Sequence, residues 1–291
     1  MSAATVAHTR VALPALERLY EHEGLPAFDL PAALSEAYGG SLGFAEPRVY
    51  ANFVSTLDGV VALPGQRHSN RIISDYSAAD RFVMGLLRAC ADAVLVGAET
   101  MRDAPGTLWT AEQAHPPAAA LFGELRRTCE RSPQPTIAVL SGHGSIDPQH
   151  PALEAGALVL TSEVGAARLR NKLPGASTIV TIGPEPRLDP AAAVAALRSR
   201  GHDLILCEGG PRAFGALLVG GLVDELFLTT SPLLAGRPEK ESRPALVEGV
   251  QLLPAVTARC ELLTLKHCGS QLFARYRCRV SRWDCGDGGP S

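Results

Sequence analysis

From Arg48 onward, short runs of Val, Ile and Leu alternate with windows in which apolar residues recur at helical spacing. This alternation is typical of an α/β protein, in which helices connect the strands of a largely parallel sheet. Strands are expected at residues 49–55, 93–97, 136–141, 157–161, 178–182 and 203–207. Helices are expected at residues 77–91, 164–173, 190–200 and 211–220. Ser77 and Asp189 are suitable N-caps, so the sequence predicts one α/β domain over residues 46–281.

The ends of the chain and one internal segment depart from this pattern. Residues 1–45 are expected to form an N-terminal extension, in which an amphipathic stretch at residues 13–20 predicts a short helical cap. Residues 103–135 contain several prolines and little periodicity, which predicts an excursion on the surface. Residues 282–291 are rich in glycine and predict a flexible tail.

The pattern after Val223 changes from alternating strands and helices to strands alone. Strands are expected at residues 260–265 and 272–280, joined by a turn at Gly269 and Ser270. Two strands joined by such a short turn form an antiparallel hairpin. The sheet is therefore predicted to be mixed, with a parallel part followed by an antiparallel end.

Composition excludes several classes of function. The chain carries 27 Lys and Arg against 30 Asp and Glu, a net charge of −3, without a long block of one sign, so we expect no nucleic-acid partner. It contains no apolar run of about 18 residues and no signal-peptide pattern, so we expect a cytoplasmic protein without membrane contact. Seven cysteines without a C-x-x-C pair predict no metal site, and Cys90, Cys207 and Cys260 are expected in the core.

The strongest local motif runs from Asp203 to Gly215, where an apolar strand leads through Glu208, Gly209 and Gly210 into a helix. Glycines let a ligand approach the backbone, and the free N–H groups at a helix start suit a phosphate. A tight turn without a ligand explains the two glycines equally well. Glu208 ends an apolar strand, so its carboxylate is expected to be nearly buried and to need partners.

Two further strand ends carry polar residues. Gly97 clears space after one strand, and Thr100 offers a hydroxyl to a phosphate, although a role as helix N-cap explains Thr100 as well. The strand that ends at Ser55 leads to Asp58 and Gly59, where a carboxylate could orient a substrate, relay a proton or simply form a turn. Because open α/β sheets bind ligands at the carboxyl ends of their strands, these turns predict a common cleft.

Taken together and in this order, the motifs within residues 48–280 resemble the riboflavin-biosynthesis pyrimidine reductase family. These motifs are Ser55-Thr-Leu-Asp-Gly59, Asp80-Arg-Phe, Leu86-Leu-Arg88, Val96-Gly-Ala-Glu-Thr100, Glu208-Gly-Gly210, Gly221-Leu-Val-Asp-Glu225 and Pro232-Leu-Leu-Ala-Gly236. The resemblance implies a dihydrofolate-reductase-like, three-layer αβα fold with a mixed, mostly parallel central sheet. It also implies a homodimer that uses NADPH to reduce 5-amino-6-(5-phosphoribosylamino)uracil, a small-molecule substrate, by hydride transfer to ribose C1′.

The resemblance also implies roles for individual residues. Asp58 and Glu208 become the catalytic candidates, and Arg88, Ser74 and Asp103 become the candidates for substrate binding. The candidates for cofactor binding are Val54, Gly97, Thr100, Ser141, Gly209, Gly210, Pro211, Arg212, Ala213 and Phe214. Bifunctional relatives carry a zinc deaminase with H-x-E and P-C-x-x-C motifs. Neither motif occurs here, so the resemblance implies a reductase alone.

Two departures from the family pattern leave the substrate open. Residues 60–61 are valines where many members have a basic residue, and residues 103–110 replace an acidic pair followed by Leu-Thr-x-Arg. Arg71, Arg81 and Arg102 are the candidates to replace the missing phosphate contacts. A pterin- or dihydrofolate-type reductase is therefore one alternative. A nucleotide-binding member of the family without turnover is another.

Overall fold

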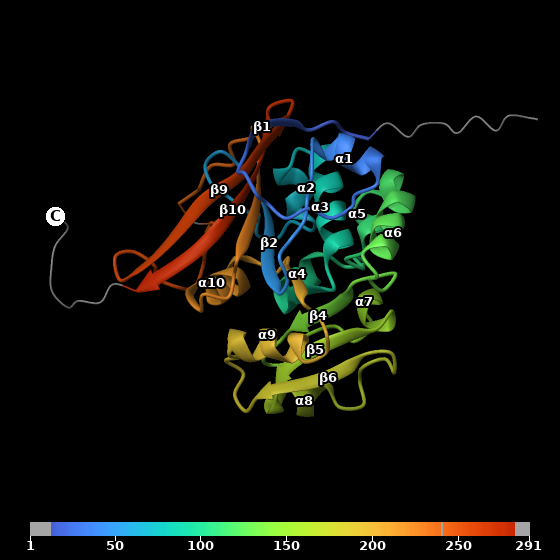
Figure 1. Ribbon diagram of the computed structural model, residues 1–291. Coiled ribbons are helices and arrows are strands. Elements are labelled where there is room, and N and C mark those ends of the chain that lie inside the picture. Colours follow the sequence, from blue (N-terminus) through green and yellow to red (C-terminus); the bar gives the residue numbers. More distant parts are fainter. Residues whose placement is uncertain (1–12, 240, 283–291) are drawn as a thin grey trace, which may run out of the picture.

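One mixed sheet runs through the domain (Figure 1). The computed structural model describes residues 13–239 and 241–282. Ten strands follow the order β1-β9-β10-β8-β2-β7-β3-β4-β5-β6. Their bounds are β1 Glu17–Glu21, β2 Arg48–Ser55, β3 Ala93–Gly97, β4 Thr136–Leu140, β5 Ala157–Ser162, β6 Thr178–Gly183, β7 Leu204–Cys207, β8 Glu225–Thr230, β9 Val256–Cys268 and β10 Gln271–Arg282. Neighbours from β8 to β6 are parallel, whereas β10, β9 and β1 are added antiparallel.

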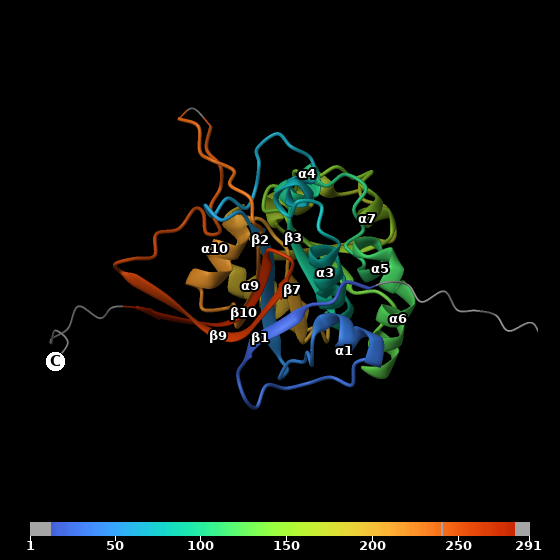
Figure 2. The ribbon, with the colours of Figure 1, turned by 90° about the horizontal axis from the view of Figure 1, so that it is seen from above.

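Helices cover both faces of this sheet. Their bounds are α1 Ala32–Tyr38, α2 Ser69–Ile73, α3 Ala78–Cys90, α4 Ala98–Asp103, α5 Ala111–Ala114, the 3₁₀ helix η1 Pro116–Ala118, α6 Ala119–Thr128, α7 Pro151–Glu154, α8 Glu163–Leu169, α9 Pro190–Arg198 and α10 Pro211–Val219. Figure 2 shows α3, α5 and α6 on one side of the sheet and α9 and α10 on the other. The predicted three-layer αβα fold with a mixed, mostly parallel sheet is confirmed. Within the described residues, no helix combines the length and hydrophobicity needed to cross a membrane.

Side chains along the central strands alternate between two cores. In β7, Leu204 and Leu206 belong to the core beneath α3, whereas Ile205 and Cys207 belong to the core beneath α9 and α10. All four side chains are fully buried. Because helices cover both faces, the parallel strands are continuous apolar runs rather than alternating polar and apolar sequences.

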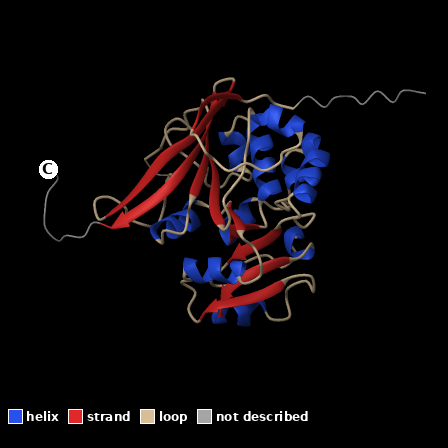
Figure 3. Cartoon of the chain, viewed as in Figure 1, coloured by secondary structure: helices blue, strands red, loops and turns tan. Residues whose placement is uncertain are grey.

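Most predicted elements agree closely with the structure. Each of the six predicted parallel strands agrees with the observed one within one residue at either end. The predicted N-caps are confirmed: Ser77 Oγ accepts the N–H of Asp80, and the Asp189 side chain accepts the N–H of Ala191. The C-terminal hairpin is also confirmed and is longer than predicted, since β9 and β10 both extend beyond the core (Figure 3).

The segment with the predicted helical cap contains a strand instead. Residues 17–21 form β1, which pairs antiparallel with β9 and places Glu17 opposite His267. Figure 1 shows β1 across the top of the β9–β10 hairpin. An unpaired edge strand exposes backbone N–H and C=O groups, and β1 satisfies those of β9. The helical expectation for residues 13–20 is therefore wrong, because a partner some 250 residues away in the chain determines this conformation.

Residues 103–135 also differ from the prediction of a surface excursion. Asp103 is the last residue of α4, and the helices α5, η1 and α6 follow it. Helices α5 and α6 pack against α3. Trp109, Phe122 and Leu125 are buried in the core. The guanidinium of Arg126 donates hydrogen bonds of 2.7–3.2 Å to three carbonyl groups at the end of α3. Pro116 and Pro117 begin η1, and the helices of this segment are short, so its sequence shows no long helical periodicity. Its buried side chains nevertheless belong to the core.

The cysteines divide between the core and the hairpin. Cys90 and Cys207 are buried, as predicted. Cys260 is exposed, which contradicts the core prediction, because it lies on the part of β9 that extends past the helices. Its Sγ atom lies 3.9 Å from that of Cys278, its cross-strand neighbour. Of the predicted tail, Arg282 ends β10, and the rest lies outside the described residues.

Candidate active site

A cavity of about 1180 Å³ opens where β2, β7, β3 and β4 end. These strands are parallel neighbours, so the segments that follow them meet at one edge of the sheet. The loop of residues 61–65 and the helices α2 and α4 form further walls. Pockets for one drug-sized ligand usually measure about 300–1,000 Å³. The cavity exceeds this range, as a site for a cofactor and a second molecule would need to.

Most of the predicted site residues surround this cavity. The residues that line it are Val54, Ser74, Arg88, Gly97, Thr100, Asp103, Ser141, Glu208, Gly209, Gly210, Pro211, Arg212 and Ala213. His68 and His143, from two loops, line it as well. Two predicted residues, Asp58 and Phe214, do not. The structure thus brings the turns at residues 97–100 and 208–213 together beside β2, whereas the predicted turn at Asp58 and Gly59 does not line the cavity. Contact of each residue with a ligand stays a prediction.

The Gly209-Gly210 turn is close-packed against α10 and α4. A Cβ on Gly209 would lie 2.9 Å from Ala213 Cβ, too close for an ordinary contact, so the turn requires glycine there. A Cβ on Gly210 would lie 3.5 Å from Thr100 Oγ1, which places the Thr100 hydroxyl across from the turn. Gly97, not Thr100, is the N-cap of α4. The N-cap explanation for Thr100 is therefore wrong, and its hydroxyl remains available to a ligand.

Helix α10 presents free backbone donors to the cavity. The first N–H groups of a helix have no partner within the helix, and Pro211 at the first position has no N–H. Arg212 and Ala213 are therefore the first donors, and both line the cavity. A Cβ on Gly97 would meet no atom within 4 Å, so a ligand can approach the backbone of Gly97 in the cavity wall. This arrangement fits the phosphates of a dinucleotide.

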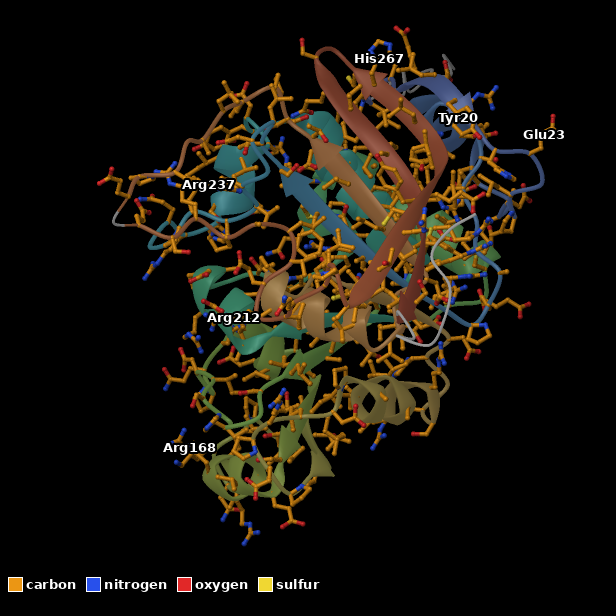
Figure 4. The ribbon with its side chains drawn as sticks, turned by 90° about the vertical axis from the view of Figure 1, so that its left-hand side faces the viewer. Tyr20, Glu23, Arg168, Arg212, Arg237 and His267 are labelled. Atoms are coloured by element: carbon orange, nitrogen blue, oxygen red, sulfur yellow. The ribbon has the colours of Figure 1, made fainter. Side chains whose placement is uncertain are left out.

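Two arginines, Arg102 and Arg212, line this part of the cavity, and Arg168 bonds to a residue of its wall. In Figure 4, Arg212 lies between Arg237 and Arg168 along one side of the molecule. Arg168 donates a hydrogen bond of 2.8 Å to Ser145 Oγ, and Arg102 donates one of 3.2 Å to the Ser145 carbonyl. Arg102, Arg212 and Ser145 line the cavity. Positive charge at the rim of a cavity attracts anionic ligands.

A buried ion pair forms another wall. Arg88 Nε lies 2.8 Å from Glu208 Oε1, and Nη2 lies 2.6 Å from Oε2, so the pair is bidentate. The two side chains are only 5% and 9% exposed. Arg88 Nη1 also donates to the Thr110 carbonyl. The expectation that Glu208 is nearly buried and needs partners is confirmed. Since both of its oxygens accept from Arg88, this geometry favours positioning of a substrate over proton donation.

Asp58 anchors a loop outside the cavity. Its carboxylate accepts hydrogen bonds from the Thr56 hydroxyl and from the N–H groups of Ala235 and Gly236, at 3.1 and 2.8 Å. The bond from Thr56, followed by that from Ala235, lowers the pKa of Asp58 to about 2. The catalytic role predicted for Asp58 is therefore not supported, because backbone groups far along the chain occupy its oxygens.

Three further predictions have different outcomes. Phe214 is fully buried, and its ring packs 5.0 Å from that of Phe53, so it belongs to the core rather than to a cofactor site. Ser74 is buried at the end of α2 and lines the cavity. Asp103 lines the cavity from the exposed end of α4, and desolvation, followed by the nearby Glu99 charge, raises its pKa.

Asp80 also lines the cavity, and no role for it followed from the sequence. It is 4% exposed and lies in the first turn of α3, where its N–H donates to Ser77 Oγ at 3.2 Å. Burial raises the pKa of its carboxyl to about 6. An acidic residue three positions after a helix cap is typical of helix starts in general. That signal therefore does not distinguish a site residue from a stabilising one.

The fold and the cavity define an α/β protein with a candidate ligand site at the carboxyl edge of its sheet. Residues 47–274 match the RibD C-terminal domain family, and the chain belongs to it. This is a family of riboflavin-biosynthesis reductases with a dihydrofolate-reductase-like fold, so the resemblance seen in the motifs is confirmed. No curated protein matches the sequence. In residues 13–239 and 241–282, no three His, Cys, Asp or Glu side chains form a potential metal site.

Solved structures share this fold at low sequence identity. A pyrimidine reductase-like protein from Corynebacterium diphtheriae is 22% identical, with a TM-score of 0.60, over 86% of this chain and 96% of that one. A diaminohydroxyphosphoribosylaminopyrimidine deaminase/5-amino-6-(5-phosphoribosylamino)uracil reductase from Thermotoga maritima is 21% identical, with a TM-score of 0.56, over 80% and 56%. A riboflavin biosynthesis reductase from yeast is 12% identical, with a TM-score of 0.52, over 86% and 95%. The chain thus spans little more than half of the Thermotoga protein.

Proposed function

We propose that this protein is an NADPH-dependent reductase of 5-amino-6-(5-phosphoribosylamino)uracil, which receives hydride at ribose C1′ in its ring-opened imine form. The proposal is carried by one observation: a single cavity is lined both by the turns at residues 97–100 and 209–213 and by the buried Arg88–Glu208 pair. Membership of the RibD C-terminal domain family supports it. The name of the Thermotoga relative, which includes this reductase activity, supports it as well.

The two parts of the cavity have different tasks in this proposal. When bound, NADPH supplies the hydride. The turns at residues 97–100 and 209–213 would hold its phosphates. The Arg88–Glu208 pair still has donors and lone pairs beyond those used within the pair, so it would orient the polar groups of the substrate. Enclosing walls would exclude water while the two reactants are held together.

The activity assay uses two acceptors. The purified protein should oxidise NADPH in the presence of enzymatically prepared phosphoribosylaminouracil, with kcat/KM of at least about 10⁴ M⁻¹s⁻¹. Mass spectrometry should identify the ribitylamino product. Dihydrofolate is the second acceptor, because a pterin-type reductase is the alternative. Turnover of dihydrofolate alone would replace the proposed substrate, and turnover of neither acceptor while NADPH binds would contradict the proposed activity.

Arg71 is the candidate contact for the substrate phosphate, because it is exposed and lines the cavity from α2. Arg71→Ala is expected to raise KM for the phosphorylated substrate about tenfold to hundredfold while kcat stays unchanged, since a charge-assisted hydrogen bond contributes ~1.5–3 kcal/mol. Steady-state kinetics measure this effect. Arg67→Ala, at an exposed position outside the cavity, is the matched control. An unchanged KM in Arg71→Ala would show that Arg71 does not bind the substrate phosphate. Arg81 and Arg102, which also line the cavity, would then be the candidates for this contact.

The resemblance to the family also leads us to propose that the protein is a homodimer. The chain has a mass of 30.6 kDa. Light scattering coupled to size-exclusion chromatography should therefore give a mass of about twice this value. A mass equal to that of one chain at micromolar concentration would contradict the proposed dimer.

A further inference from the structure

Among the described residues, five carboxylates line the cavity, and Asp80 and Glu208 are the two that are nearly inaccessible to water. Glu99 and Asp103 are exposed on α4. Glu248 is half-buried and accepts a backbone hydrogen bond, and Glu208 is held by its arginine. Among these five, Asp80 is therefore the buried carboxylate that no arginine pairs with.

The surroundings of Asp80 raise the pKa of its carboxyl above the ordinary value. Ser74, at the end of α2, and Thr229, in β8, offer it hydroxyl groups. The charged groups that face it are Glu208, from the turn after β7, and Arg81, on its own helix. Desolvation and the like charge of Glu208 raise its pKa to about 6, against the lowering effects of the two hydroxyls and Arg81.

Asp80 differs from the other buried carboxylate in the described part of the chain. Glu225 is neutralised by Arg275, whose Nε lies 2.6 Å from Oε2. No ion pair involves Asp80 among the described residues, and the buried guanidinium in the cavity wall, that of Arg88, pairs with Glu208. Two carboxylates in one site with such different environments commonly divide into an anion and an acid. Here Glu208 is the ion-paired member, and Asp80 is the member able to hold a proton.

We propose that Asp80 is the proton donor for the reduction of a C=N bond in this cavity. Addition of hydride to the carbon forms the new C–H bond and moves the electron pair of the π bond to nitrogen. That nitrogen takes the proton of the Asp80 carboxyl, and solvent at the cavity mouth later returns a proton to the carboxylate. The C=N bond is thereby reduced and NADPH oxidised. The inference rests on the proposed reductase function, but not on which C=N substrate is reduced.

The protonation of Asp80 can be measured without turnover. In the full-length protein labelled with ¹³C at its aspartate carboxyl carbons, the resonance absent from Asp80→Asn identifies Asp80. Its titration with pH is followed in the presence and absence of NADPH. We expect a midpoint near 6 in the free protein. A midpoint near 4, the value of an ordinary aspartate, would overturn the inference whatever the reductase assay shows.

Kinetics then test whether this proton is used. In the wild-type protein, kcat/KM should fall as pH rises through about 6, because the carboxyl loses its proton. Asp80→Asn should lower kcat about 10²- to 10⁴-fold and abolish this pH dependence. Its NADPH affinity should stay unchanged, which shows that the protein is folded. An Asp80→Asn protein that keeps the wild-type rate, or the wild-type pH dependence, would overturn the inference.

Asp75→Asn is the matched control for this experiment. Asp75 is exposed, lies outside the cavity and has a positive φ of 54°, which asparagine tolerates. Its substitution should change neither kcat nor the pH profile. Absence of turnover by the wild-type protein on both phosphoribosylaminouracil and dihydrofolate would contradict the proposed function instead. The carboxyl titration separates that outcome from a failure of the assignment to Asp80.

Discussion

Gly97→Leu is expected to weaken NADPH binding at least about 100-fold, or about 3 kcal/mol, without loss of stability. Gly97 is the N-cap of α4, and its φ of −88° and ψ of 157° are extended angles that any residue adopts. A Cβ there would meet no atom within 4 Å. The leucine side chain would therefore extend into open cavity, in the place proposed for the cofactor phosphates.

Gly183→Leu is the control for this substitution. Gly183 ends β6, does not line the cavity, and also has no atom within 4 Å of an added Cβ. Isothermal titration with NADPH and thermal unfolding are measured on both variants. Unfolding temperatures close to wild type are expected for both, with binding lost only in Gly97→Leu. Wild-type affinity in Gly97→Leu would place the cofactor elsewhere.

Arg275→Met is expected to lower the free energy of unfolding by about 3–5 kcal/mol, because it removes the close partner of the buried Glu225 carboxylate and leaves it only Arg48, whose Nε lies 4.0 Å away. The Arg275 and Glu225 side chains are only 2% and 6% exposed. Arg275 also donates a 2.8 Å hydrogen bond to the Gly43 carbonyl and lies over the rings of Phe44 and Phe227. Urea denaturation at neutral pH measures the change.

Arg277→Met provides a matched comparison on the same strand. Arg277 pairs with Glu261, but these side chains are 33% and 44% exposed. Exposed pairs contribute at most about 1 kcal/mol, so this variant should remain close to wild type. A double variant, Arg275→Met with Glu225→Gln, should recover part of the lost stability, since it removes the stranded charge. Equal effects of the two arginine substitutions would contradict this account of the core.

The parallel half of the fold could be predicted because its signals are local. Buried strands between two helical layers are continuous apolar runs, and Ser77 and Asp189 cap the following helices within a few residues of chain. Strand β1 could not be predicted in this way. Its five residues become a strand by pairing with β9, where Glu17 lies opposite His267.

The same distinction applies to the site. The strand before Glu208 predicted a nearly buried carboxylate, but its partner Arg88 lies 120 residues away and entered only through the family resemblance. Asp58 has the sequence context of a site residue, yet the backbone of residues 235–236 binds its oxygens. Asp80 has the context of a helix start, yet β8 and α2 enclose it in the cavity. Such differences depend on tertiary contacts, which local patterns do not contain.

Transfer of a labelled hydride tests the central claim most directly. NADPH carrying deuterium at C4 of its dihydronicotinamide ring, prepared as each of the two epimers, is incubated with phosphoribosylaminouracil and the protein. The product is then examined by mass spectrometry and NMR. The account predicts a ribitylamino product that carries deuterium at C1′ with one epimer and none with the other. Formation of this product without deuterium from either epimer, or its absence while NADPH remains bound, would contradict the account.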